Sequence, residues 1–189
     1  MARFTALFDA SVLYSASISF LVMETARAGI FRARWSPQIH DEWTRNLIKN
    51  RPDLDPIKVH RRREIMDVTV HDALITEFDD LIPSIDLPDP DDKHVLAAAI
   101  AGHADVIVTL NLRDFPADNL VRYGIEAQHP DTFLIHQRGM NEQLFLQCVR
   151  RCRRRLKNPE IDVDRYLEGL RKAGLVVLAA ELGQAKGLL

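Results

Sequence analysis

Four acidic residues stand at positions where an α/β protein places groups that do chemistry. Asp9 and Asp114 each follow a short apolar, β-prone run of the chain. Asp92 precedes an alanine-rich helical segment, and Glu42 lies on another predicted helix. Functional groups gather at the carboxyl ends of strands in such proteins, and carboxylates crowded there repel one another unless a divalent cation neutralises them. Oxygen ligands suit Mg²⁺ or Mn²⁺, and such a site supports metal-assisted attack of water on a phosphodiester.

Each acid, taken singly, also has a structural explanation. Asp9 could cap the helix that follows it. Asp92 stands in the first turn of a helix, near the positive end of its dipole. Glu42 alone fits a solvated helix face, and Asp114 fits a turn before a Phe-Pro pair. The functional hypothesis therefore depends on the joint arrangement of the four carboxylates.

Strand-like and helix-like segments alternate over most of the chain. Apolar and β-prone runs predict strands at residues 4–8, 30–35, 105–110 and 124–128. Periodicity and capping signals predict helices at residues 10–29 (as one helix or two), 36–51, 56–66 and 95–102, and a further helix from residue 130. Ser36 followed by Pro37 is a helix start, with a cap and then proline at the first helical position. This alternation predicts an α/β fold with a central parallel sheet.

Composition limits the class of protein. The 189 residues fit one domain with a small appendage, and the formal net charge of -2 excludes a polybasic coat for nucleic acid. Two cysteines exclude a disulfide scaffold and a zinc site made of thiolates alone. The best apolar run, residues 10–23, is shorter than the ~20 residues of a membrane span. Asp9 directly before that run does not fit a signal peptide, so we expect a cytoplasmic protein without membrane contact.

The strand signals stop near residue 138. Helical patterns follow at residues 142–157, 163–172 and 175–186, so we predict a domain at residues 1–138 and a helical C-terminal extension at residues 139–189. Cys148 and Cys152 lie on the apolar stripe of the first of these helices, which favours packing over metal binding. Its other faces carry five arginines, which form either a solvated face or a surface for RNA phosphates or an acidic partner. They are Arg150, Arg151, Arg153, Arg154 and Arg155.

Four segments together resemble the PIN-domain ribonucleases, and among them the VapC-like toxins of bacterial toxin–antitoxin pairs. The segments are Phe-Asp-Ala-Ser-Val-Leu-Tyr at residues 8–14, Trp-Ser-Pro-Gln-Ile-His-Asp-Glu-Trp at 35–43, Asp-Pro-Asp-Asp-Lys-His-Val-Leu-Ala-Ala-Ala at 89–99 and Val-Thr-Leu-Asn-Leu-Arg-Asp-Phe-Pro at 108–116. The resemblance covers residues 4–138 in order. It implies a PIN-like three-layer α/β domain around the parallel sheet.

The resemblance also implies a ligand set for Mg²⁺ or Mn²⁺. The strand-end aspartate of the family falls on Asp9, its helical glutamate on Glu42, and the aspartate before its alanine-rich helix on Asp92. The acid after the family's threonine falls within residues 111–114. These positions are the expected catalytic and metal-binding residues.

The sequence departs from the family at one of these positions. Many members carry aspartate where this chain has Asn111, so the fourth ligand is either the Asn111 carbonyl oxygen or the Asp114 carboxylate. Ser11 and Thr109 could hydrogen-bond to the carboxylates or act as local caps. His94 could approach the site, although a structural or solvated role is favoured for it.

The function implied is a divalent-metal-dependent endoribonuclease, the toxin of a toxin–antitoxin pair. Its partners would be RNA and an antitoxin, and family members commonly form homodimers. Two alternatives remain open. Asn111 allows a PIN-like RNA- or protein-binding domain with a degraded metal site. An aspartate-based phosphatase with Asp9 as nucleophile fits less well, because that pattern needs a second aspartate where this chain has Ser11.

Overall fold

The computed structural model describes residues 4–157 and 160–189 of the chain. Its sheet has four parallel strands in the order β2-β1-β3-β4. The strands are β1 (Thr5–Phe8), β2 (Arg32–Arg34), β3 (Val106–Val108) and β4 (Glu126–Gln128). The predicted parallel α/β fold is confirmed, with each strand within or overlapping its predicted run.

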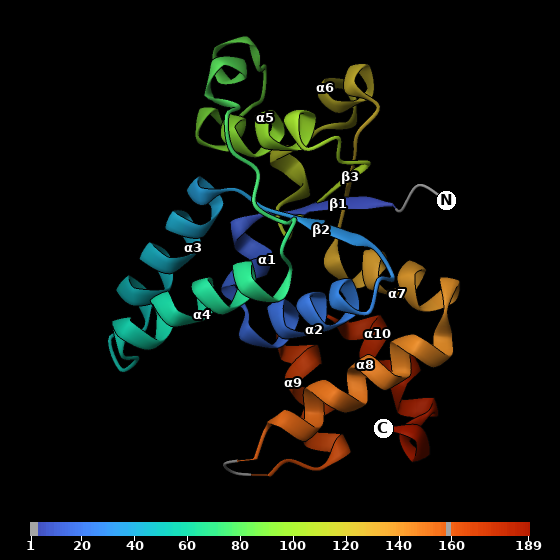
Figure 1. Ribbon diagram of the computed structural model, residues 1–189. Coiled ribbons are helices and arrows are strands. Elements are labelled where there is room, and N and C mark those ends of the chain that lie inside the picture. Colours follow the sequence, from blue (N-terminus) through green and yellow to red (C-terminus); the bar gives the residue numbers. More distant parts are fainter. Residues whose placement is uncertain (1–3, 158–159) are drawn as a thin grey trace.

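Helices cover both faces of this sheet, which gives the three expected layers (Figure 1). On one side lie α5 (Lys93–Ala101) and α6 (Ala117–Leu120). On the other side lie α1 (Ala10–Tyr14), α2 (Ala16–Arg27), α3 (Pro37–Asn50), α4 (Pro56–Thr69) and α7 (Pro130–Met140). Single turns of 3-10 helix, among them η2 (Pro90–Asp92) and η3 (Leu112–Asp114), complete the connections near the site.

Local signals explain where the helices begin. Ser36 caps α3 by accepting a hydrogen bond from the Ile39 backbone N–H, as predicted from the Ser-Pro pair. The segment after Asp9 forms two helices rather than one, because Ser15 ends α1 and its hydroxyl caps α2.

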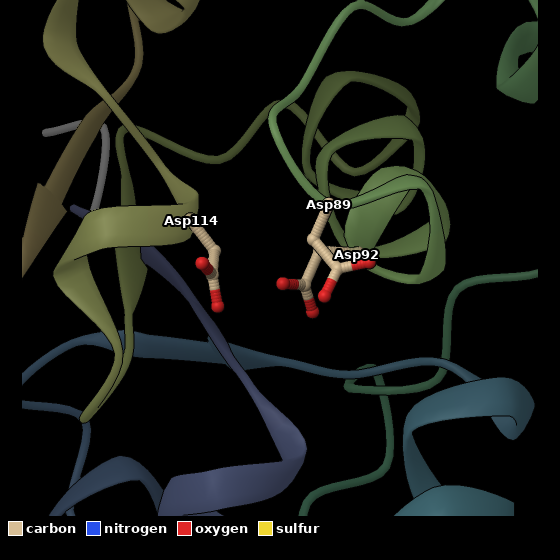
Figure 2. Close-up of side chains that lie close together, drawn as sticks. All are labelled: Asp89, Asp92 and Asp114. Atoms are coloured by element: carbon tan, nitrogen blue, oxygen red, sulfur yellow. The ribbon is translucent and has the colours of Figure 1, made fainter.

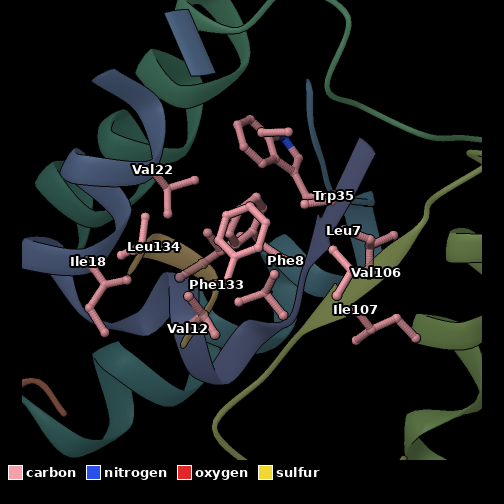
Figure 3. Packing of buried hydrophobic residues seen from close by; sticks show 14 of the residues in the cluster. Leu7, Phe8, Val12, Ile18, Val22, Trp35, Val106, Ile107, Phe133 and Leu134 are labelled. Carbon is pink, nitrogen blue, oxygen red and sulfur yellow. The ribbon is translucent and has the colours of Figure 1, made fainter. Parts of the chain in front are cut away.

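The core lies between the sheet and the helices. Successive side chains of a strand point to opposite faces, and Figure 3 shows Leu7 and Phe8 of β1 doing so. The Phe8 ring meets the Phe133 ring edge to face with 5.5 Å between centroids, and Phe31 packs on Phe133 at 4.9 Å. Leu7 and the three phenylalanine side chains are buried. Because Phe133 belongs to α7 and Phe8 to β1, α7 packs directly onto the first strand.

Three further helices extend the chain: α8 (Glu142–Arg155), α9 (Val163–Lys172) and α10 (Val176–Gln184). Helix α8 packs on α2, and α10 packs on α7 and α9. Cys148 and Cys152 are free and buried in this packing, as predicted. The Asp131 carboxylate on α7 accepts hydrogen bonds of 2.8 Å from the Val177 and Leu178 N–H groups at the start of α10. The division of the chain at residue 138, which falls inside α7, stays a prediction.

The arginine-rich face of α8 is partly used inside the molecule. Arg151 and Arg155 both pair with the carboxylate of Glu24 on α2, which is 1% exposed. The Arg153 guanidinium donates to the carbonyl oxygens of Ile161 and Leu189. The prediction that all five arginines form a solvated or ligand-binding face therefore does not hold for Arg151, Arg153 and Arg155 in full, because each makes contacts inside the molecule. In the part of the chain that the structure describes, no helix combines the length and apolarity that crossing a bilayer would require.

Candidate metal centre

The site is built at the carboxyl ends of the two central strands. In the parallel pair β1–β3, Phe8 lies opposite Val108, so the next residues, Asp9 and Thr109, leave the sheet side by side. The Asp9 backbone N–H donates to the Val108 carbonyl oxygen at 3.0 Å and continues the ladder by one bond. Topology therefore brings together two residues that are 100 positions apart.

Hydrogen bonds fix the Asp9 carboxylate. One oxygen, Oδ1, accepts from the Ala10 N–H at 2.6 Å, so Asp9 does cap α1. The other, Oδ2, accepts from the hydroxyls of Ser11 at 2.6 Å and Thr109 at 2.8 Å. Burial raises the pKa of Asp9, these hydroxyls hold it down, and the charge of Glu42 raises it further. Asp9 thus caps α1 with one carboxylate oxygen and binds the two hydroxyls with the other, so the capping role and the place in the site are compatible.

Asp92 and Asp114 face each other next to this acid. Together with Asp89 they each place one carboxylate oxygen within 4.8 Å of the others. Figure 2 shows Asp89 and Asp92, at the two ends of η2 just before α5, facing Asp114, which projects from η3 on the opposite side. The Asp89 side chain also accepts from the Asp91 N–H at 2.9 Å, so it caps η2 in addition.

Electrostatic repulsion within the site is strong. Burial raises the pKa of Asp92 to about 7, and the charges of Asp9 and Asp114 contribute to that rise. A carboxyl group with such a pKa is half protonated near neutrality unless positive charge is supplied. The negative charges of Asp9 and Asp114 therefore both act on the Asp92 carboxyl.

Glu42 reaches the site from α3. Its Oε2 lies 3.5 Å from Nε2 of His94, which stands on the first turn of α5. The other ring nitrogen of His94, Nδ1, is buried and has no hydrogen-bond partner among the described residues. His94, for which the sequence favoured a structural role, thus faces a predicted site residue.

A buried polar network holds α3 in place. The Trp43 indole N–H donates to Nδ1 of His40 at 2.8 Å, so the proton of this imidazole is on Nε2. That nitrogen lies 3.0 Å from Oδ1 of Asp67, which also accepts from the Trp35 indole N–H at 2.7 Å. The side chains of His40, Trp35 and Trp43 are fully buried. His40 and Trp43 flank Glu42 on α3, so the network fixes the helix at the position of Glu42. The sequence analysis missed this network, and two tryptophans flanking a histidine are its only local signal.

Arg62 of α4 ties two elements of the site together. Its guanidinium donates to the carbonyl oxygens of Leu13 and Tyr14 at the end of α1, and lies over the Trp43 ring of α3 at 4.4 Å. Burial lowers its pKa to about 10. The side chain fixes the helix that follows Asp9 against the helix that carries Glu42. Arg62 lies within the helix predicted at residues 56–66, and nothing in the sequence indicated this role.

Asn111 lies beside the acids. Its backbone N–H donates to the Thr109 hydroxyl oxygen at 2.9 Å, and its side-chain amide donates to Oδ2 of Asp114. This contact leaves the amide carbonyl oxygen as the atom of Asn111 that could bind a cation. The prediction that either Asn111 or Asp114 binds the cation remains open between these two residues.

The donor set suits a hard divalent cation. It consists of carboxylate oxygens with an amide oxygen nearby, and these are the ligands that Mg²⁺ and Mn²⁺ prefer. The raised pKa of Asp92 indicates that the fold gathers more negative charge here than it neutralises. A cation would remove this repulsion, and a centre of this type can assist attack of water on a phosphate ester.

Comparisons with known proteins agree with this architecture. A family model described as "PIN domain" matches residues 5–113, which is more than half of the chain. A second one, "VapC50 C-terminal domain", matches residues 130–184. A protein of Mycobacterium tuberculosis (strain ATCC 25618 / H37Rv), named "Putative ribonuclease VapC50", is 54% identical over 52 residues, or 28% of this chain and 31% of that protein. The chain thus matches about a third of that relative's length. No solved structure matches it.

Proposed function

Because this chain belongs to the PIN-domain family, we propose that it is a divalent-metal-dependent endoribonuclease that hydrolyses RNA phosphodiester bonds. The observation that carries the proposal is the convergence of the Asp89, Asp92 and Asp114 carboxylates. The charge of Asp9, which follows β1, also acts on Asp92. The similarity to a protein that is itself named a ribonuclease supports the same activity.

The proposed ligands of the cation are Asp9, Asp92 and Asp114, with Glu42 and Asn111 as further candidates. When bound, Mg²⁺ or Mn²⁺ would polarise the scissile phosphate and make water a better nucleophile near neutral pH. The carboxylates would have to be ionised to bind it, so proton release from Asp92 accompanies metal binding.

Other residues of the chain position these ligands. The hydroxyls of Thr109 and Ser11 orient Oδ2 of Asp9 and favour its ionised form. His94 lies against one oxygen of Glu42 and limits the orientations that this carboxylate adopts. Arg62 keeps α1 and α3 at a fixed spacing. Catalytic groups held in this way lose little entropy when the substrate binds.

We further propose that the protein acts as a toxin controlled by an antitoxin protein. The match of residues 130–184 to the VapC50 C-terminal domain supports this assignment, as does the relative's name. Cytoplasmic action and homodimer formation remain predictions. The identity of the neighbouring reading frame, expected to encode a small DNA-binding protein, tests the toxin–antitoxin part of the proposal independently of the chemistry.

The ribonuclease activity is tested with purified protein and labelled single-stranded RNA. We expect cleavage with Mn²⁺ or Mg²⁺, none in excess EDTA, and restoration when the cation is added back. Asp9→Asn should abolish cleavage while its circular dichroism spectrum stays that of the wild type. Cleavage that persists in EDTA would contradict the metal dependence.

Further measurements on the same purified protein distinguish the two alternatives from a nuclease. A domain with a degraded centre would bind RNA without cleaving it and would gain no thermal stability from Mn²⁺. A phosphatase would hydrolyse a phosphomonoester through a trappable aspartyl-phosphate on Asp9. Either result would replace the nuclease proposal.

A further inference from the structure

A cavity lies along the outer edge of β2, away from the acidic centre. It has a volume of about 620 Å³ and is bounded by the end of α2, by β2, by the end of α4 and by Arg155 of α8. Figure 1 shows β2 running beside α2 and α4. Arg32, the first residue of β2, pairs with Thr5, the first residue of β1. Asp9 stands at the other end of β1, directly after its last residue, Phe8. Four residues of strand separate the two levels by roughly 13 Å.

Arginines dominate the charge of this cavity. Arg27, Arg32 and Arg155 line it, and the acid among the lining residues is Asp72. Arg27 and Arg155 share the single carboxylate of Glu24 behind the wall. Arg151 binds the same carboxylate. The wall therefore carries more guanidinium groups than carboxylates.

Arg32 is the clearest unpaired cation of this group. Its side chain is exposed and makes no ion pair or side-chain hydrogen bond within residues 4–157 and 160–189. Arg34, two residues further along β2 and outside the cavity lining, has a buried Nε that finds no hydrogen-bond partner among the described residues. Burial and the charge of Arg32 lower the pKa of Arg34, while Asp72 acts in the opposite direction. An anion in the cavity would relieve this repulsion.

The same cavity has an apolar wall. Val68 and Val70 at the end of α4 line it, together with Ala26 and Phe31. Val68 is 68% exposed, so its apolar surface is open to a ligand at the rim of the hollow. The cavity volume lies in the range of about 300–1,000 Å³ that is usual for small-ligand sites, and its lining combines polar and apolar surface.

We propose that this cavity binds one nucleotide of single-stranded RNA outside the catalytic centre. Its phosphate would contact the guanidinium groups of Arg32 and Arg155, which match phosphate oxygens in geometry and charge. Its base would pack against Val68 and Val70. The proposal depends on the ribonuclease function for the choice of RNA over a free nucleotide, but not on the metal chemistry.

Binding is measured by fluorescence anisotropy with a short labelled single-stranded RNA in EDTA, where no metal-dependent cleavage interferes. Arg32→Gln removes a guanidinium without a partner in the described structure, so the fold should be unaffected. We expect its affinity for RNA to fall roughly three- to tenfold at low salt, and the slope of log K against log[salt] to decrease by about one. Val68→Asp should also weaken binding, because it places a charge where the base would lie.

The control is Arg165→Gln, which removes an exposed arginine of α9 and changes the net charge equally. Equal losses for Arg32→Gln and Arg165→Gln, or no loss for either, would overturn the proposal. Because the assay contains no metal, a protein that fails to cleave RNA can still pass it, and the two proposals fail separately.

Thermal shifts with inorganic phosphate, uridine monophosphate and a polyglutamate peptide identify the ligand class. We expect the nucleotide to stabilise the wild type more than phosphate does, and Arg32→Gln to lose that difference. Equal stabilisation by phosphate and nucleotide would contradict the base contact. Arg32-dependent binding of the mononucleotide without RNA binding would make this a free-nucleotide site. Arg32-dependent binding of polyglutamate without RNA binding would make it a site for an acidic protein segment.

Discussion

The Thr109 hydroxyl donates a 2.8 Å hydrogen bond to Oδ2 of Asp9 and thereby joins the ends of two neighbouring strands. The same hydroxyl oxygen accepts from the Asn111 N–H, so one side chain connects the buried acid with the loop that carries Asp114. Position and ionisation of Asp9 therefore depend on β3 as well as on its own strand.

Replacing Thr109 tests this connection. Thr109→Val keeps the shape of the side chain but removes the donor, so the pKa of Asp9 should rise and its hold on a cation should weaken. A hydrogen bond to a charged group contributes about 1.5–3 kcal/mol, so we expect Mn²⁺ affinity to fall at least about tenfold in calorimetry. Thr109→Ser should retain most of the affinity. Equal affinities for the valine and serine variants would show that the hydroxyl does not matter.

The stability of the metal-free protein should depend on Asp92. Its pKa is about 7 in the fold and 3.8 ordinarily, so the folded state binds this proton more tightly than the unfolded state. The stability that results is complete below about pH 4 and is lost as pH rises through about 7. Urea unfolding in EDTA should show this decline for the wild type and a flatter profile for Asp92→Asn. Adding Mn²⁺ should reverse the decline at pH 7.5, and identical profiles for the two proteins would refute the raised pKa.

Three variants decide whether Asn111 or Asp114 is the fourth ligand. Loss of the Asp114 carboxylate removes a full charge next to the cation, whereas loss of the Asn111 amide removes a dipole. We therefore expect Asp114→Ala to lose far more Mn²⁺ affinity than Asn111→Ala, and Asn111→Asp to bind more tightly than the wild type. Calorimetric titration of the three variants measures this. A greater loss for Asn111→Ala would assign the ligand to Asn111 and a turn role to Asp114.

Asp9 and Asp89 should differ in what they do. Asp9→Asn should abolish RNA cleavage and relieve growth inhibition, with the fold as stable as before or more so, since it removes like-charge repulsion. Asp89→Asn should retain most of the cleavage, because asparagine caps as well as aspartate. Initial cleavage rates and chemical denaturation of both variants provide the comparison. Similar residual activities would mean that Asp89, which lies within the carboxylate group, also takes part in catalysis.

Glu24 should anchor the C-terminal helices. Burial by itself raises the pKa of this carboxyl, but hydrogen bonds from Arg27 and Arg151 outweigh it and lower the pKa. Its contribution to stability is therefore present above the ordinary pKa of 4.5 and is lost on acidification. Glu24→Gln should cost roughly 2–3 kcal/mol in urea unfolding at pH 7.

Glu168→Gln is the matched control for that variant. It alters an exposed glutamate that pairs with Arg171 and Lys172, and should cost less than about 0.5 kcal/mol. Comparable losses in the two variants would argue that the buried ion group at Glu24 does not hold α8 to α2.

Much of the architecture could be predicted because its signals are local. The apolar run before Asp9 and the one at residues 105–110 indicate buried parallel strands without reference to any partner. Ser36 and Pro37 define the start of α3 by their own capping and backbone chemistry. The stripe with Cys148 and Cys152 likewise indicates a buried helix face through its period alone.

The rest required the tertiary structure, since it depends on which distant groups meet. Three features arise from the packing of separate elements, for which sequence spacing carries no signal: the closeness of Asp89 to Asp114, the contact of Glu42 with His94, and the contacts of Arg62 with α1 and Trp43. The pKa of Asp92 follows from burial and from neighbours on other elements, and neither can be read from its own segment. The sequence by itself determined the elements and the candidate acids. Tertiary structure alone decided which charges confront one another, because Coulomb interaction and desolvation depend on distance in space and not along the chain.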